Sequence, residues 1–462
     1  MACVCALFSL HLFTGMADNG DFSRTYGFLI AKPLGWAVDV PAGDSPDWPR
    51  RFFSMWRDRW ILYPGLSNVT HLFSFSTEKI CFAFQVAFSA IVTGTPHVYS
   101  VIVGSLPGRL AYLAGFFWLF VLLRRHGSAR LAWAYLICVT PVILCANFAS
   151  FLNSFYEEQV GIILFPALAG LLYLVAVTRR MRYGAAAFLL VWFIALSKTA
   201  YFPLPIVAAP FIFPAFRGKV ATWKLGAAVL VAAMLAFLPA KFGEFKGVNQ
   251  FHTLYYGALK VMKDDGGIDV ATIGGKPVLT DCVFVSGFTE KGIECVARAH
   301  ATYMDTARLV AAHPKIALHM IDYAFERGNT VLIDNIGLNM ESGPAFSTLP
   351  PFTLWNRIYS HHGNILSLLL AAVSMIALRR LGPLARVGLF FVAWGAVQYL
   401  MALGDGFHEL QKHLIGGNYS ASLALVLLTV TMLEAAWRGV RNHSKDDDKA
   451  DAEQRKEYAG AN

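Results

Sequence analysis

Carboxylates directly follow the first apolar run of the chain, in Asp18-Asn19-Gly20-Asp21. A carboxylate that a turn holds at the end of a membrane helix, partly shielded from water, can have a raised pKa and act as a general base toward a hydroxyl. Asp18 and Asp21 are therefore candidate catalytic bases. The same run also fits a structural role, because Asn-Gly often ends a helix and aspartates favour turns.

A second acidic run, residues 153–159, reads Asn-Ser-Phe-Tyr-Glu-Glu-Gln and precedes a long apolar stretch. Glu157 and Glu158 are candidate catalytic carboxylates, and Asn153 and Tyr156 place further polar groups beside them. Paired glutamates at the start of a helix also compensate the helix dipole, which is the alternative interpretation of this run.

Side chains suited to binding an anion occur in two further places. Lys198 lies near the end of an apolar stretch, where a lysine either extends to the membrane interface or holds an anion. The loop 404–418 contains Lys412 and His413, which are suited to bind a phosphate leaving group, with Arg24 as a bidentate partner. The alternative for this loop is a solvated turn rich in glycine.

The composition places these residues in a membrane protein. Hydrophobic residues make up 56% of the 462 residues and charged residues 15%, and the mean hydropathy is +0.50. The formal charge of +9 could indicate a nucleic-acid partner, but its excess lies in short loops and at the end of the last apolar stretch. Membrane topology and anionic lipid account for charge in those places, so we expect the lipid bilayer and no nucleic acid as a partner.

The apolar stretches predict ten membrane crossings, on the expectation that about 20 apolar residues span a bilayer. They lie near residues 1–16, 105–123, 131–147, 159–178, 184–201, 203–216, 225–240, 361–378, 386–403 and 419–437. The predicted fold is therefore an all-α polytopic membrane protein.

Four short loops between these stretches are rich in arginine and lysine and contain no acid, namely 124–130, 179–183, 217–224 and 379–386. The positive-inside bias places all four in the cytoplasm, and ten crossings return the C-terminus to the same side. Apart from Glu434 and the C-terminal tail, every carboxylate then faces outward. We therefore predict a multi-pass protein of the cytoplasmic (inner) membrane whose active site faces the periplasm or exterior.

The predicted crossings divide the chain into four parts. These are a transmembrane module, 1–240, with a catalytic first outer loop at 17–79; an outward cap of turns and short helices, 241–360; C-terminal transmembrane helices, 361–437; and a disordered cytoplasmic tail, 438–462. The apolar stretch 80–93 is interpreted as an interfacial or re-entrant helix, because counting it as a crossing would invert every later loop. The first segment also fits a cleaved signal peptide or a mis-chosen start codon.

Two of the seven cysteines, Cys282 and Cys295, lie in the outward cap and flank a turn that contains glycine. Cysteines outside the reducing cytosol commonly pair, so we predict a disulfide between them. The other five lie in apolar stretches, where we expect small core residues. No spacing resembles a zinc site, so we predict no resident metal there, and the sequence leaves a divalent-cation requirement open.

The layout of these features resembles the GT-C superfamily of integral-membrane glycosyltransferases. The likeness rests on an acid in the first outer loop, an acidic stretch in the second, a lysine at a helix–loop junction and a large outer loop late in the chain. Within the superfamily the chain is most similar to the WsfD-type hexose transferases of bacterial glycan assembly. Two short motifs connect it to them, Ala-Asp-Asn-Gly-Asp-Phe-Ser-Arg at 17–24 and Gln-Lys-His-Leu at 411–414.

The resemblance implies transfer of a sugar from a polyprenyl-phosphate carrier to a hydroxyl of a glycan, lipid or protein acceptor at the outer face. One carboxylate of the group Asp18, Asp21, Glu157 and Glu158 would deprotonate the acceptor, and attack on the anomeric carbon would invert it. The donor phosphate would be bound by Arg24, Lys198, Lys412 and His413. The acceptor or the sugar would be bound by Asn153, Tyr156, Asp405 and Glu409. Which of Asp18 and Asp21 is the base stays open.

Two other classes of protein fit parts of the sequence. A lipid-linked glycan flippase or secondary transporter is expected to carry ionisable groups near the midplane of the bilayer, broken helices and repeats. A non-catalytic subunit of a glycan-assembly complex would need no outward clusters of acids. The outward carboxylates favour the enzyme, and neither a Gly-rich phosphate loop nor a soluble nucleotide-binding domain is present in the sequence.

Overall fold

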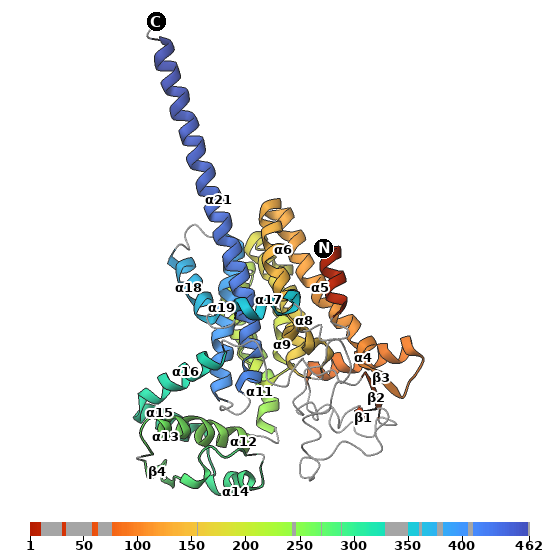
Figure 1. The fold of residues 1–462 in the computed structure, drawn as a ribbon, viewed down its shortest axis with the longest axis vertical. Helices are drawn as coiled ribbons and strands as arrows, with labels where there is room; N and C mark the ends of the chain where they lie inside the picture. Colours follow the sequence, from red (N-terminus) through yellow and green to blue (C-terminus); the bar gives the residue numbers. More distant parts are fainter. Residues whose placement is uncertain are drawn as a thin grey trace.

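The computed structural model describes residues 1–10, 30–33, 58–62, 76–154, 156–242, 246–268, 270–287, 289–328, 350–359, 363–376, 382–404 and 410–460. The described chain is an all-α membrane protein with little sheet. Helices form a bundle, and a separate group of short helices covers one end of it (Figure 1). We call the covered end the capped end; the N-terminus and the extended C-terminal helix lie toward the opposite end.

Four helices in the described residues are long and apolar enough to cross a membrane. They are α5 (Val101–His126), α8 (Glu158–Thr178), α19 (Pro383–Gly404) and the Ile415–Arg438 part of α21 (Ile415–Gly460). A fifth crossing is present if α6 (Ala129–Ile143) and α7 (Ala146–Ser150), which continues as η3 (Phe151–Asn153), form one broken span with a bend of 63°.

The other predicted crossings correspond to shorter helices. They are α1 (Ala2–Ser9), α9 (Met181–Ala195), η4 (Thr199–Tyr201) with α10 (Leu204–Ile212) and η5 (Phe213–Ala215), α11 (Thr222–Phe242) and α18 (Gly363–Ile376). Each lies within or overlaps an apolar stretch of the sequence, but none is a candidate span; α11 has 21 residues, of which Thr222–Leu238 form one of the shorter apolar helices. The number of ten crossings therefore stays a prediction.

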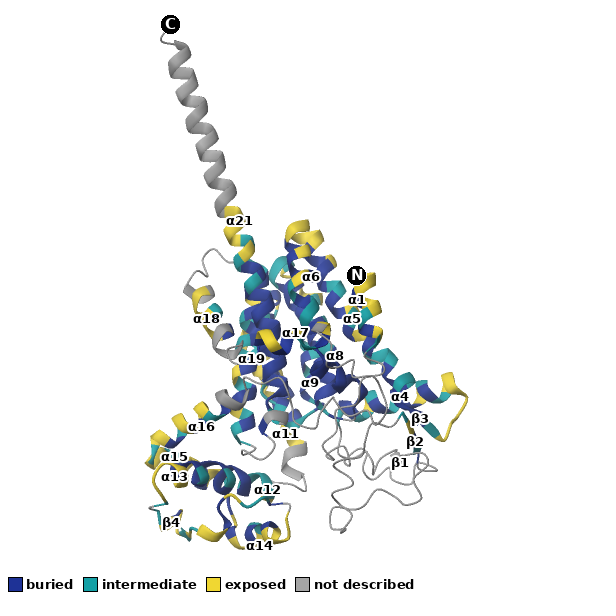
Figure 2. Ribbon diagram, in the orientation of Figure 1, coloured by how far each residue is buried: buried dark blue, intermediate teal, exposed yellow. Residues whose placement is uncertain are grey.

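Small residues allow the long helices to approach each other closely. Along α5, Gly115 faces α8 so tightly that an added Cβ would lie 2.8 Å from the backbone nitrogen of Ala167. On α19, a Cβ at Gly388 would lie 2.8 Å from the side chain of Leu428 on α21. Such contacts are typical of helix pairs in membranes, where packing rather than the hydrophobic effect joins helices. Buried residues are concentrated where α8, α19 and α21 meet (Figure 2).

Helix α4 (Thr77–Thr93) does not number among the candidate spans and lies across the capped end of the bundle (Figure 1). Ser76 caps its start, and Gly94, with a φ of 65°, ends it in the left-handed conformation that glycine tolerates. The helix occupies the stretch that the sequence predicted as interfacial or re-entrant. Beside it, β1 (Ile30–Pro33), β2 (Arg59–Leu62) and β3 (Val98–Ser100) form an antiparallel sheet.

The cap has a second hydrophobic core, built around Phe251, Leu254 and Leu309, which also includes Tyr399 and Ala402 of α19. Its elements are α12 (Lys246–Phe251), the π-helix η6 (His252–Ala258), α13 (Leu259–Asp264), the hairpin β4 (Thr272–Ile273) and β5 (Lys276–Pro277), η7 (Thr280–Cys282), α14 (Glu290–Ala299), α15 (Tyr303–Ala312) and α16 (Pro314–Gly328). Cys282 and Cys295 form a disulfide, with Cα atoms 5.7 Å apart. This is the pair that the sequence predicted.

Two further short helices complete the described chain: α17 (Pro350–Tyr359) lies between the cap and α18, and α20 (Leu410–His413) lies between α19 and α21. The last helix, α21, differs from the sequence-based expectation, because it continues to Gly460 where we predicted a disordered tail. Between Arg438 and Ala459 the sequence contains one glycine and no proline, so nothing in it stops a helix that the preceding span has already nucleated.

Candidate functional site

Glu158 and Lys198 form an ion pair near the capped end of the bundle. Glu158 is the first residue of α8, and Lys198 lies at the start of η4, just after α9 ends. The Lys198 Nζ lies 2.5 Å from Oε1 of Glu158, and the two side chains are 13% and 4% exposed. The sequence predicted a catalytic carboxylate at Glu158 and an anion-binding lysine at Lys198. The structure pairs these two side chains, so the charge of each neutralises that of the other.

Glu78, in the first turn of α4, is a third charged residue of this region that sequence reasoning missed. Its side chain is 3% exposed. Burial, together with the nearby carboxylates of Glu157 and Glu158, raises the pKa of Glu78 to about 8, and Lys79 opposes this rise. Glu78 is therefore mostly protonated at neutral pH. We call Glu78, Glu157, Glu158 and Lys198 the glutamate–lysine cluster.

The start of α4 is anchored to the end of α9, which explains why Glu78 is buried. The Thr77 hydroxyl donates to the carbonyl of Phe193 (2.6 Å), and the backbone N–H of Thr77 donates to Leu196 (3.2 Å). The Ser76 hydroxyl donates to the carbonyl of Ser197 (2.9 Å). These carbonyls are the ones that a helix C-terminus leaves without a partner. Because α4 satisfies them, its first turn lies directly beside Lys198.

Amide side chains hold the acidic run against α4. The Gln159 amide donates to the carbonyls of Leu152 (3.0 Å) and Ser154 (3.1 Å), and its oxygen accepts from Gln85 of α4 (3.0 Å). The Tyr99 hydroxyl in turn donates to Gln85 (3.2 Å). All of these groups are buried, so the network fixes the loop that precedes α8 and with it Glu157 and Glu158.

Arg109 of α5 is a second residue that sequence reasoning missed. Its guanidinium, 3% exposed, donates to Oδ1 of Asn153 from Nη2 (2.6 Å) and from Nε (3.3 Å), and to the Ser105 hydroxyl (3.3 Å). Its charge also lies 5.5 Å from the centre of the Phe8 ring. The sequence carried a signal for it, because an arginine inside a predicted span, 105–123, is by default a candidate functional residue.

Asn153 and Tyr156 of the acidic run are buried. Asn153 is 2% exposed, and its side-chain oxygen is occupied by Arg109; Tyr156 is 4% exposed and packs against Phe151 with ring centres 5.7 Å apart. The structure thus places both residues beside the cluster, where Asn153 positions Arg109. Their predicted role in binding an acceptor or a sugar stays a prediction.

Segment 198–201 also contacts the start of α21. The Gln398 amide on α19 donates to the carbonyl of Ala200 (3.0 Å). Gly416 lies so close to Tyr201 that a Cβ there would be 3.0 Å from the tyrosine oxygen. Residues that directly follow the predicted phosphate-binding pair Lys412 and His413 therefore lie against the segment that carries Lys198.

Not every predicted site residue can be placed. Lys412 and His413 lie on α20, at the capped end, and His413 is half-buried. Five further predicted residues lie outside the described residues, namely Asp18, Asp21, Arg24, Asp405 and Glu409. Of the predicted set, the structure brings Glu157, Glu158, Lys198, Asn153 and Tyr156 into one region.

The break between α6 and α7 carries a second polar group. The Asn356 amide of α17 donates to the side-chain oxygen of Asn147 on α7 (2.9 Å), and Cys145 Sγ donates to Oδ1 of Asn356 (3.1 Å). All three side chains are buried. Polar side chains from a neighbouring helix commonly satisfy the polar groups at a break in a membrane helix.

One group of residues in the described chain has the spacing of a metal site, Asp281 with Cys282 and Cys295. Both cysteines are joined in the disulfide, so their sulfurs are not thiolate ligands. These residues therefore do not fit a metal ion.

No protein-family model, no curated protein and no solved structure matches this chain. The likeness to the GT-C superfamily accordingly rests on the layout and the short motifs of the sequence.

Proposed function

We propose that this protein is a membrane glycosyltransferase that moves a sugar from a polyprenyl-phosphate donor to a hydroxyl of a glycan, lipid or protein acceptor. The observation that supports it most is the buried glutamate–lysine cluster at the capped end of the bundle. If the four basic loops are cytoplasmic, this end faces outward. The outer compartment has no supply of nucleotide sugars, so an outward-facing site favours a polyprenyl-phosphate sugar as the donor.

In the proposed reaction, the acceptor hydroxyl loses its proton to Asp18 or Asp21 as its oxygen attacks the anomeric carbon. The bond from that carbon to the phosphate oxygen breaks, so the anomeric centre inverts and polyprenyl phosphate leaves. Lys198 supplies positive charge to the departing phosphate, and Glu158 holds the ammonium in place.

Glu78 has a role in this scheme because of its protonation state. With a pKa of about 8 it is mostly neutral at pH 7, so it adds no further negative charge beside Glu157 and Glu158. A phosphate approaching Lys198 then meets less repulsion than three ionised glutamates would cause.

The test is transfer by purified protein in liposomes that contain polyprenyl-phosphate hexoses, with lipid-linked donor and product followed by mass spectrometry. Asp18→Asn and Asp21→Asn are the decisive variants, because loss of a general base typically slows a reaction ~10²–10⁴-fold. We expect the larger loss at Asp18, which is nearer to the first apolar stretch and so to a lipid-borne phosphate. If the wild-type protein transfers sugar and both variants do so at the same rate, neither aspartate is the base. The run 18–21 would then be a turn that ends a helix.

A second candidate function is transport of a lipid-linked glycan across the membrane. Two observations favour it, the broken helix pair α6 and α7 and the buried charge of Arg109 within the span α5. A transporter would move a labelled lipid-linked sugar across sealed vesicles and leave its covalent structure unchanged. The liposome experiment therefore separates the two functions, because the enzyme consumes the donor and the transporter does not.

A further inference from the structure

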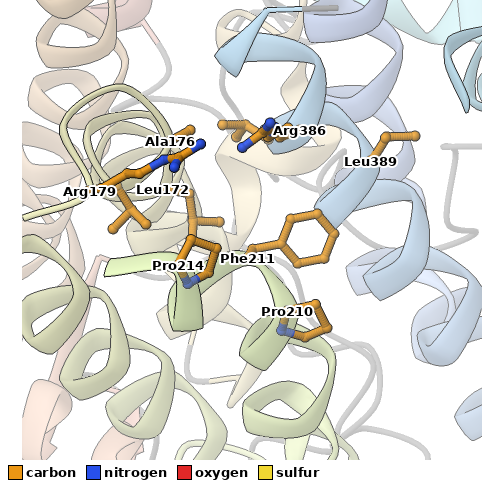
Figure 3. A pocket seen from close by; sticks show the side chains of 10 residues that line it. Leu172, Ala176, Arg179, Pro210, Phe211, Pro214, Arg386 and Leu389 are labelled. Carbon is orange, nitrogen blue, oxygen red and sulfur yellow. The ribbon is translucent and has the colours of Figure 1, made fainter. Parts of the chain in front are cut away.

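A pocket of about 240 Å³ opens between helices α8, α10 and α19 at the end of the bundle opposite the cap. Most of its lining is apolar, including Leu172, Phe211 and Leu389. Arg179 and Arg386 are its two charged residues, and Figure 3 shows their side chains at the same end of the pocket. The pocket thus has a cationic mouth and an apolar body.

The two arginines come from helix ends that the fold brings together. Arg179 follows the last residue of α8 and adopts a left-handed conformation, with φ of 49°. Arg386 lies near the start of α19, whose first turn begins at Pro383. The N-terminus of α19 carries a partial positive charge, which adds to the attraction that Arg386 exerts on an anion, whereas the C-terminus of α8 carries a partial negative charge that Arg179 offsets.

Within the described residues, neither guanidinium is paired with a carboxylate. The predicted cytoplasmic loops that contain them, 179–183 and 379–386, hold no acid either. Two like charges at one pocket mouth repel each other, and an anion with several oxygens would relieve that repulsion. A phosphate fits best, because the planar guanidinium donates two parallel hydrogen bonds to it.

The apolar body of the pocket favours a phosphate-bearing ligand that also has an apolar part. A soluble phosphate would leave the walls formed by Leu172, Phe211 and Leu389 in contact with water or empty. A phospholipid fills them with the start of an acyl chain, and anionic lipids concentrate in the leaflet that basic cytoplasmic loops contact. We propose that Arg179 and Arg386 bind the phosphate of an anionic phospholipid whose acyl chain occupies the pocket between α8, α10 and α19.

The site differs from the glutamate–lysine cluster in place and in chemistry. Helix α8 carries Glu158 at its first residue and Arg179 just beyond its last, so the two sites lie at opposite ends of one helix. The lipid joins α8 to α10 and α19 at one end, whereas the ion pair joins α8 to η4 at the other. The proposal is independent of the enzymatic function.

The experiment measures lipid binding by native mass spectrometry of the purified, delipidated protein to which phosphatidylglycerol or phosphatidylcholine is added. We expect phosphatidylglycerol to bind more tightly. Arg179→Gln and Arg386→Gln should each weaken it about fivefold, on the basis of about 1 kcal/mol for each basic residue near an anionic surface. The double variant should show roughly the product of both losses. Arg182→Gln is the matched control, because Arg182 lies three residues after Arg179, in the first turn of α9, and does not line the pocket.

Two further comparisons test the acyl-chain part. Ala176→Phe places a ring in the pocket, and should reduce binding of phosphatidylglycerol while both arginines remain. Inorganic phosphate at millimolar concentration should not displace the lipid. Size-exclusion profiles identify any variant that fails to fold. If the double variant or Ala176→Phe does so, the lipid binding of the single arginine variants tests the proposal. Equal binding of the two lipids, equal loss in Arg182→Gln, or displacement by phosphate would overturn the proposal.

Discussion

At the residue scale, a charged side chain buried in the bundle needs either a partner of opposite charge or a proton. Glu158 and Lys198 are each nearly removed from water, so the pair is stable only while both members are present. Glu78 avoids the cost of a buried charge in another way, because it keeps its proton at neutral pH instead of pairing with a group of opposite charge. The cluster therefore contains one ion pair and one acid that is neutral at pH 7.

Removing one member of the pair should destabilise the protein. Lys198→Ala leaves Glu158 buried without its cation, and we expect a loss of about 3–5 kcal/mol in the free energy of unfolding. The double variant Glu158→Gln, Lys198→Met should lose much less, because no charge stays buried. Thermal unfolding in detergent, followed by intrinsic fluorescence, measures both.

The pair Lys260 and Asp264, whose side chains are 20% and 60% exposed, provides the more solvated control for this prediction. Its carboxylate is 60% exposed, so Lys260→Ala should change stability by less than about 1 kcal/mol. A Lys198→Ala protein as stable as the Lys260→Ala protein would mean that the Glu158 carboxylate is solvated in the membrane-embedded protein.

Glu78 should make stability depend on pH. Its pKa is about 8 in the folded protein and 4.5 in the unfolded chain, so between these values the unfolded state releases a proton that the folded state keeps. The contribution of Glu78 to stability should therefore be highest below about pH 4.5, fall as pH rises to about 8, and stay level above it. Glu78→Gln should remove this decline, so the variant gains most over wild type at pH 8.

The measurement is unfolding of wild type and Glu78→Gln at a series of pH values. Glu290→Gln is the matched control, because Glu290 is exposed at the start of α14 and should leave the pH profile unchanged. Parallel profiles for wild type and Glu78→Gln would show that Glu78 titrates as it does in water.

At the element scale, the ends of helices and the loops between them are held in place by contacts with neighbouring elements. Helix α4 satisfies the carbonyls at the end of α9, and the amide network of Gln85 and Gln159 then fixes the loop before α8. In the cap, the disulfide between Cys282 and Cys295 joins η7 to α14 across a separation of 13 residues.

The disulfide should be present in native membranes and should stabilise the cap. Alkylation with and without a reductant should label both cysteines only after reduction. Loss of such a bridge typically lowers stability by about 2–4 kcal/mol, so Cys282→Ser with Cys295→Ser should make the cap more sensitive to protease. Cys3→Ser is the control, because Cys3 is a free, exposed thiol. Two thiols that react without reductant would contradict the prediction.

Orientation in the membrane is a property of the whole molecule. The turn between α5 and α6 lies away from the cap (Figure 1). Arg179 follows the last residue of α8 and Glu158 is its first, so this basic loop and the carboxylate cluster occupy opposite ends of α8. If the protein follows the positive-inside bias, the cap is external.

Reporter fusions test this orientation. A reporter after Arg182 or Gly382 should be cytoplasmic, and one after Gly266 in the cap or after Gly406 should be external. A matched pair of reporters, one active only in the cytoplasm and one only outside, gives a positive signal on either side. An external signal at Gly382 would contradict ten crossings and would move the proposed active site to the cytoplasm.

The sequence by itself determined the apolar helices, because burying backbone in a bilayer requires long apolar runs, and it determined the cysteine pair, whose partners lie close in the chain. It also identified Glu158 and Lys198 as functional candidates. Tertiary structure decided that they bind each other, since 40 residues separate them. The burial of Glu78, and with it the raised pKa, became visible only from the packing of α4 on α9. Whether a glutamate near the start of a helix is buried depends on what covers it, and no local sequence pattern encodes that.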